Sequence, residues 1–134
     1  MVIIDGILTA NGENVGNWAG AGSGGSIFII CGTFDGGTNG MLRANGGSTD
    51  QSNGGAGGGG RIAVWYNVPS ERYAGIADGS NMRHVIITDS YVRFTGTLSV
   101  TNGLGYVNMP PDGATPGSLV FLTVKRLGSL MHLR

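Results

Sequence analysis

The chain has 134 residues, which suits one domain, and glycine supplies 27 of them, roughly three times its ordinary share. Eight basic and eight acidic residues cancel, which argues against a nucleic-acid groove or an anionic membrane surface as partner. No apolar run reaches the roughly 18 residues of a membrane span, and a single cysteine excludes an internal disulfide.

Short runs of β-branched and aromatic residues, bounded by glycine or small polar residues, predict strands. In chain order these runs are Ile27–Ile30, Ile62–Tyr66, Val85–Ile87 and Leu119–Leu122. Lysine and glutamate, which are common on helix surfaces, are scarce. Only the tail at 124–134 has the composition of a short helix, and Gly128 interrupts it. We therefore expect an all-β domain.

The sequence repeats itself. The segment GILTANG at 6–12 recurs as GMLRANG at 40–46, and the Gly-rich segment at 20–27 recurs at 55–62. A weaker third copy follows further along the chain. The domain at 1–124 then consists of repeats at 2–31, 32–66 and 91–124 with an irregular insert at 67–90. A C-terminal tail follows at 125–134.

Each copy is predicted to contain a strand, a turn, a second short strand, a Gly-rich loop and an apolar third strand. In the turns, asparagine and glycine are expected to adopt left-handed backbone angles. One copy cannot bury its own apolar face, whereas stacked copies can, each strand pairing with its equivalent one layer away. We therefore expect a short right-handed parallel β-helix, or β-solenoid. The alternative is an antiparallel Gly-rich β-sandwich or barrel, which the Asn-Gly hairpin signal favours.

The blocks GILTANG, GMLRANGG and GGAGGGGRIAVWY resemble the Gly-rich repeat segments of very large secreted or surface proteins from environmental bacteria. They are similar to parallel β-helix adhesin and pectin-lyase-like modules. The resemblance covers residues 2–66 well and 91–123 loosely. It implies a secreted or cell-surface location within a longer precursor, and it transfers no catalytic residue.

The Gly-rich loops of the three copies each carry one acidic residue as a candidate catalytic group: Glu13, Asp50 and Asp112. Stacked loops could place two carboxylates across one sugar bond, as polysaccharide hydrolases require. Trp18 and Tyr106 lie in the same loops and are candidate ligand-binding platforms for a sugar ring. Glu13 and Asp50 do not occupy matching repeat positions, so solvated loop acids are the favoured interpretation.

No metal or cofactor site is predicted. The glycine runs at 20–25 and 54–60 contain no aspartate that could bind Ca²⁺. Each run precedes a predicted strand, whereas a phosphate site needs a helix N-terminus there. Cys31 is expected to be a buried thiol without a histidine partner.

These observations favour a non-catalytic structural or adhesive module of a secreted protein, with a polysaccharide as candidate ligand. The alternative is a polysaccharide-active hydrolase or lyase fragment that uses Glu13, Asp50 and Asp112. Self-association is also expected, because the ends of a stack expose unpaired strand edges and no caps are evident. The apolar tail at 125–134 is expected to cover one end or to pack against a second copy.

Overall fold

The computed structural model describes residues 1–16, 19–50, 52–78, 87–88, 93–106 and 113–124. Their elements, in chain order, are β1 (Val2–Ile3), β2 (Ile7–Thr9), β3 (Ser26–Ile30), β4 (Phe34–Gly36), β5 (Met41–Arg43), β6 (Arg61–Tyr66), the 3-10 turn η1 (Ser70–Arg72), α1 (Tyr73–Ala77), β7 (Ile87–Thr88), β8 (Arg93–Phe94), β9 (Thr97–Ser99) and β10 (Ser118–Val124).

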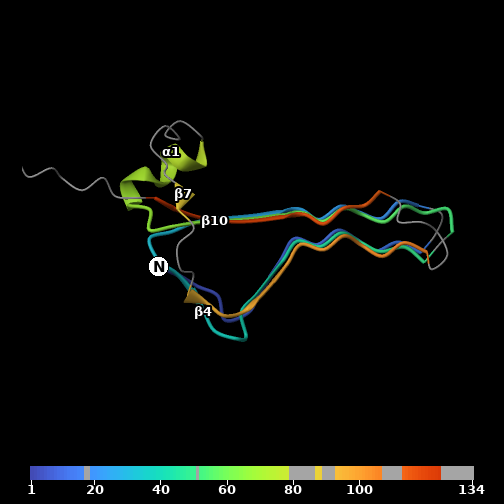
Figure 1. The fold of residues 1–134 in the computed structure, drawn as a ribbon, viewed down its shortest axis with the longest axis horizontal. Helices are drawn as coiled ribbons and strands as arrows, with labels where there is room; N and C mark the ends of the chain where they lie inside the picture. The colour runs from blue at the N-terminus through green and yellow to red at the C-terminus, as the bar shows by residue number, and fades with distance from the viewer. Residues whose placement is uncertain (17–18, 51, 79–86, 89–92, 107–112, 125–134) are drawn as a thin grey trace, which may run out of the picture.

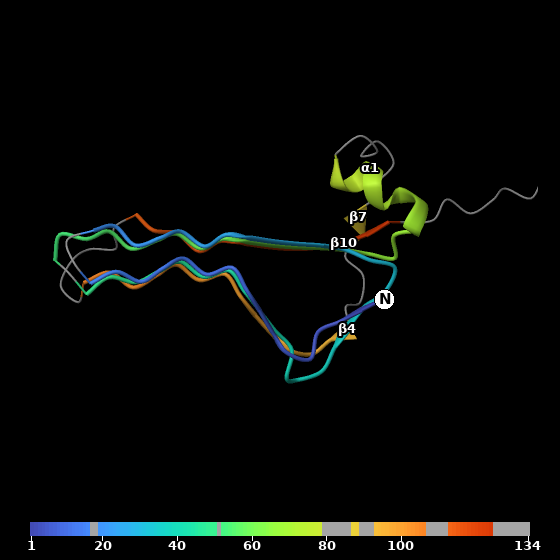
Figure 2. The same ribbon diagram turned by 180° about the vertical axis from the view of Figure 1, so that it is seen from behind.

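The chain forms a head and a long, narrow arm, which Figures 1 and 2 show from opposite sides. Each repeat leaves the head, runs to the tip of the arm and returns. We call the repeats at 2–31, 32–66 and 91–124 the first, second and third layers. The arm then consists of an outgoing row at 10–16, 44–50 and 100–106 and a return row at 19–25, 54–60 and 113–117.

Equivalent strands of the three layers pair in parallel and in register. The three sheets have the orders β1-β4-β8, β2-β5-β9 and β3-β6-β10-β7. In the second sheet Ile7 pairs with Met41, which in turn pairs with Thr97. In the third sheet Arg61 stands between Ser26 and Ser118. The pairing register therefore coincides with the spacing of the sequence repeat.

The expected β-solenoid is nevertheless contradicted. Within the described residues the strands form three small sheets beside one short helix, and no closed coil joins them. The physical reason is that the Gly-rich segments lack the side chains that would fill the interior of a coil. The outgoing and return rows therefore lie directly against each other. The antiparallel sandwich or barrel is also wrong, because β10 and β7 form the one antiparallel pair among the named strands.

The apolar core lies in the head, between the sheets. Phe34 is at its centre, with its ring 5.5 Å from that of Phe94 and 6.1 Å from that of Phe121. Burial is deepest in the second layer, which has a neighbour on both sides. Leu42 is fully buried there, whereas its first-layer equivalent Leu8 is 41% exposed. Stacking therefore provides the burial that one repeat could not provide alone.

The insert after the second layer forms η1 and α1, neither of which the sequence pattern predicted. Ile76 of α1 packs with Trp65 and Leu122 of the third sheet, and Figure 1 shows α1 on the side of β10 that faces away from β4. No helix in the described part of the chain is long and apolar enough to cross a membrane. The helix considered for the tail falls in 125–134, outside the described residues.

The arm is held by backbone hydrogen bonds in two directions. Within a row, each layer donates to the next; for example, Gly12 N donates to Asn45 O at 2.7 Å and Gly24 N donates to Gly58 O at 2.8 Å. Between the rows, successive amides donate in a zigzag through all three layers, from Gly103 to Gly57, Gly47, Gly22 and finally Glu13. The described parts of the segments predicted as loops are therefore extended, hydrogen-bonded backbone.

The glycines of this arm allow neighbouring backbones to approach closely. The expectation that they adopt left-handed backbone angles in turns was wrong for most of them. Among the described residues, positive φ occurs at Asn67 and Gly113. By contrast, a β-carbon at Gly24 would lie 2.5 Å from Gly60 N in the next layer, a separation that real β-carbons essentially never show. The absence of side chains lets the layers come within hydrogen-bonding distance of one another.

Candidate binding cleft at the arm tip

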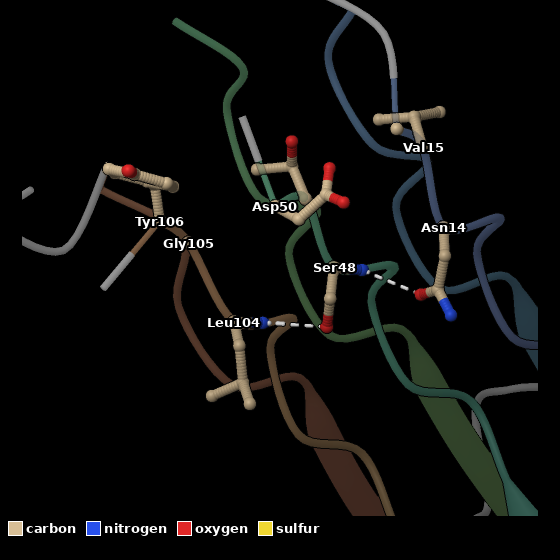
Figure 3. Close-up of a pocket in the computed structure, with 9 residues that line it drawn as sticks. Asn14, Val15, Ser48, Asp50, Leu104, Gly105 and Tyr106 are labelled. Atoms are coloured by element: carbon tan, nitrogen blue, oxygen red, sulfur yellow. Dashed lines mark hydrogen bonds between the residues drawn. The ribbon is translucent and has the colours of Figure 1, made fainter. Parts of the chain in front are cut away.

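A cleft of about 680 Å³ lies near the tip of the arm, across all three layers. Its volume falls within the range that is usual for small-molecule sites, roughly 300–1,000 Å³. Three consecutive positions from each layer line it: Asn14, Val15 and Gly16 from the first, Ser48, Thr49 and Asp50 from the second, and Leu104, Gly105 and Tyr106 from the third (Figure 3).

A ladder of hydrogen bonds fixes the floor of the cleft. Ser48 N donates to Asn14 Oδ1 at 2.7 Å, and Leu104 N donates to Ser48 Oγ at 2.9 Å (Figure 3). Backbone bonds run alongside, from Val15 N to Ser48 O and from Thr49 N to Leu104 O, each at 3.0 Å. Each layer thus positions the next, and the lining residues are held by the same repeat that builds the arm.

The lining combines apolar and polar groups. Leu104 is 74% exposed and Tyr106 is 38% exposed, so both present apolar surface at one end of the cleft. Asp50 lies beside Gly16, since a β-carbon at Gly16 would be 3.8 Å from Asp50 Oδ1. Asn14 adds an amide. A sugar ring, with one apolar face and several hydroxyls, matches an aromatic surface next to carboxylate and amide groups.

The structure brings two of the sequence-predicted site residues together. Asp50 and Tyr106 line the same cleft, and they occupy equivalent positions in the second and third layers. Glu13 is exposed in the outgoing row and does not line this cleft. Trp18 and Asp112 lie outside the described residues. The carboxylate pair that the enzyme hypothesis needs is therefore not assembled from Glu13 and Asp50.

Sequence reasoning missed Asn14, Ser48 and Leu104, which occupy one equivalent position in the three layers. Their residue types differ, so a search for matching letters passes over them. It also missed the role of the asparagine in the repeated Asn-Gly pair. Asn45 Oδ1 accepts from Thr101 N at 3.1 Å and from Ser99 Oγ at 2.7 Å. The recurrence of this asparagine was the signal for a ladder between layers.

Metal binding and the thiol of Cys31 are the other candidates for chemistry. No group of histidine, cysteine, aspartate and glutamate that could hold a metal occurs in the part of the chain that the structure describes. Cys31 is buried, and this burial raises the pKa of its thiol above the ordinary value of 9.0. The thiol is therefore protonated near neutral pH, which makes it a poor nucleophile.

Comparisons with protein families, curated proteins and solved structures find no match to this chain. The resemblance to bacterial surface repeats therefore stays a prediction, and the cleft and the arm are the features of this chain that bear on its function.

Proposed function

We propose that the chain is a non-catalytic structural or adhesive module of a secreted or cell-surface protein, and that its arm presents the tip cleft to a polysaccharide. The observation that carries this proposal is the position and lining of the cleft. It lies far from the apolar head, at the end of an arm held by hydrogen bonds in two directions. Such an arm can hold a binding surface away from the bulk of a larger protein.

The chemistry of the cleft supports a glycan ligand. Tyr106 and Leu104 offer surface for the apolar face of a sugar ring, while Asn14 and Asp50 carry groups that bind hydroxyls. A glycan chain is also long enough to extend along a cleft that spans three layers. Among the described residues the cleft contains one candidate carboxylate, Asp50, whereas hydrolysis of a sugar bond needs two.

A glycan array with the intact chain tests the proposal. We expect Tyr106→Ala to lower affinity for the bound glycans by roughly tenfold, which corresponds to about 1.4 kcal/mol. Phe28→Ala is the matched control, because Phe28 is an exposed aromatic residue of β3, in the head. Equal losses in the two variants, or no glycan binding by the unmodified chain, would refute the proposal. Release of reducing ends that Asp50→Asn abolishes would instead identify an enzyme.

A second function, self-association, is supported by the first layer. Strands β1 and β2 each pair with one neighbour among the described residues, so each has a second edge without a strand partner. Ile3 is 52% exposed on β1 and Ile7 is 69% exposed on β2. We propose that two copies meet through these edges in a closed, two-fold pair.

The mass of the protein in solution tests this pairing. Ile7→Lys should reduce the mass to that of one chain, because a charge would be buried in the contact. Leu104→Lys is the control, because Leu104 is 74% exposed and lines the cleft, which contains no residue of β1 or β2. An unmodified chain that stays single at high concentration would refute the pairing.

A further inference from the structure

The two ends of the stack differ from its interior at single positions of the arm. We call the face of the first layer that points away from the second layer the back end. The corresponding face of the third layer is the front end. At most interior contacts in the described part of the arm glycine allows the layers to approach, but each end carries a larger residue at such a position.

At the back end this residue is Glu13, whose equivalents in the second and third layers are Gly47 and Gly103. A β-carbon at Gly47 would lie 2.5 Å from the carbonyl carbon of Glu13, and one at Gly103 would lie 3.0 Å from Ser48 N. Both contacts are with the layer behind, to which both glycine amides also donate hydrogen bonds. Because Glu13 has a β-carbon, a further layer could not approach the back end in this way.

The side chain of Glu13 adds a second obstacle. Glu13 is exposed, and its backbone oxygen is the last acceptor in the zigzag of hydrogen bonds that starts at Gly103. Another layer on this face would bury its carboxylate against glycine backbone. Burying a charge without a partner is costly. Charged side chains are a common means of blocking open edges in β-proteins.

At the front end the residue is Pro116, whose equivalents are Gly24 and Gly59. A β-carbon at Gly24 would lie 2.5 Å from Gly60 N, and one at Gly59 would lie 3.0 Å from the carbonyl carbon of Val100; both contacts are with the layer in front. The Gly24 and Gly59 amides also donate to that layer, at 2.8 and 2.9 Å. Pro116 has a ring where this contact needs glycine, and it has no N–H to donate.

We propose that Glu13 and Pro116 prevent a second copy of this chain from stacking end to end on the arm, and so limit the stack to three layers. This proposal differs from the expectation that the stack has no caps. This inference goes beyond the proposed glycan binding and does not depend on it. The closed pair through β1 and β2 would join two back ends, whereas the stack that Glu13 and Pro116 block joins a back end to a front end, so the two contacts compete for the same face.

The test uses the full chain with Glu13→Gly and Pro116→Gly, singly and combined, and measures mass by light scattering. End-to-end contact joins the back of one copy to the front of another, so either residue alone blocks growth. We expect each single variant to keep the mass of the unmodified chain. The double variant should form assemblies whose mass grows with concentration. A mixture of the single variants should form complexes larger than either variant alone, but of limited size.

Glu13→Ala combined with Pro116→Gly is the matched control, because alanine removes the charge and keeps the β-carbon. This control should keep the unmodified mass. The proposal is overturned if the unmodified chain grows end to end, if the control assembles, or if the folded double variant keeps the unmodified mass. Should the double variant fail to fold by circular dichroism, the mixture of single variants decides, and a mixture without larger complexes overturns the proposal.

Discussion

Replacing Gly60 by alanine should weaken the whole stack, because Gly60 lies in the central layer of the arm. A β-carbon there would lie 2.6 Å from the carbonyl carbon of Gly24 in the first layer. Relief of this contact requires the layers to separate. Separation would disturb the bonds between these two layers, from Arg61 N to Gly25 O at 2.9 Å and from Gly24 N to Gly58 O at 2.8 Å.

The expected loss of stability follows from these contacts. Two hydrogen bonds contribute about 1 kcal/mol each, and overpacking of backbone adds about 1–3 kcal/mol. Alanine restricts the unfolded chain and returns about 0.4–1 kcal/mol. The net loss is therefore about 2–5 kcal/mol, a large part of the roughly 5–15 kcal/mol that is usual for a domain. Urea denaturation followed by the fluorescence of Trp65, which is buried in the head, measures it.

Gly55→Ala is the matched control for Gly60→Ala. Gly55 lies five positions earlier in the same return row, and a β-carbon there would have no atom within 4 Å. The free energy of unfolding of the Gly55→Ala variant should therefore stay within about 0.5 kcal/mol of that of the unmodified chain or rise slightly. Equal destabilisation by the two substitutions would show that glycine serves chain flexibility in the arm, and the argument from close approach would fail.

Three further predictions concern the ladder, the core and the thiol. Asn45→Ala removes the acceptor of two hydrogen bonds from the third layer and should cost about 1–3 kcal/mol in urea denaturation, whereas alanine at the exposed Asn53 should have little effect. Phe34→Ala should cost about 3–5 kcal/mol, because it empties the centre of the core, and an unchanged midpoint would contradict the assigned core. Cys31 should react with a thiol reagent only after unfolding. Burial raises the pKa of the Cys31 thiol in the folded state, so ionisation of this thiol destabilises the fold. The stabilisation due to the protonated thiol is complete below pH 9.0, and the free energy of unfolding should fall as the pH rises further. Cys31→Ala should abolish this fall.

The repeat in the sequence was sufficient to predict which strands pair. Ile7 and Met41 occupy the same place in two copies, and they are partners in the second sheet. Strands were also expected where β3 and β6 occur, because apolar β-branched residues are concentrated there. These parts were predictable because hydrophobic side chains report directly on burial.

The sequence alone could not show that the expected closed coil was wrong. Glycine is compatible with a flexible loop, a left-handed turn and a tightly packed extended chain, and its composition does not distinguish them. The choice depends on what surrounds each residue, such as the Gly60 backbone close to Gly24. Helix α1 was missed for a related reason. It is short, and its stability comes from the contact of Ile76 with Trp65 rather than from its own sequence.

The candidate site was predictable only in part. Tyr106 and Asp50 stood out as an aromatic and an acidic residue in Gly-rich segments, and they do share the cleft. Asn14 and Ser48 were not distinguishable from ordinary polar residues. Their roles depend on the exact alignment of three layers, which a weak third copy does not specify.

The two-way hydrogen bonding of the arm has a thermodynamic consequence. Folding of this region removes mainly peptide groups from water, and exposure of polar surface lowers the heat capacity of unfolding whereas exposure of apolar surface raises it. The arm should therefore contribute little to the heat-capacity increment, or reduce it. Calorimetry should show a flatter dependence of stability on temperature than is usual for a chain of this length, with less loss of stability on cooling.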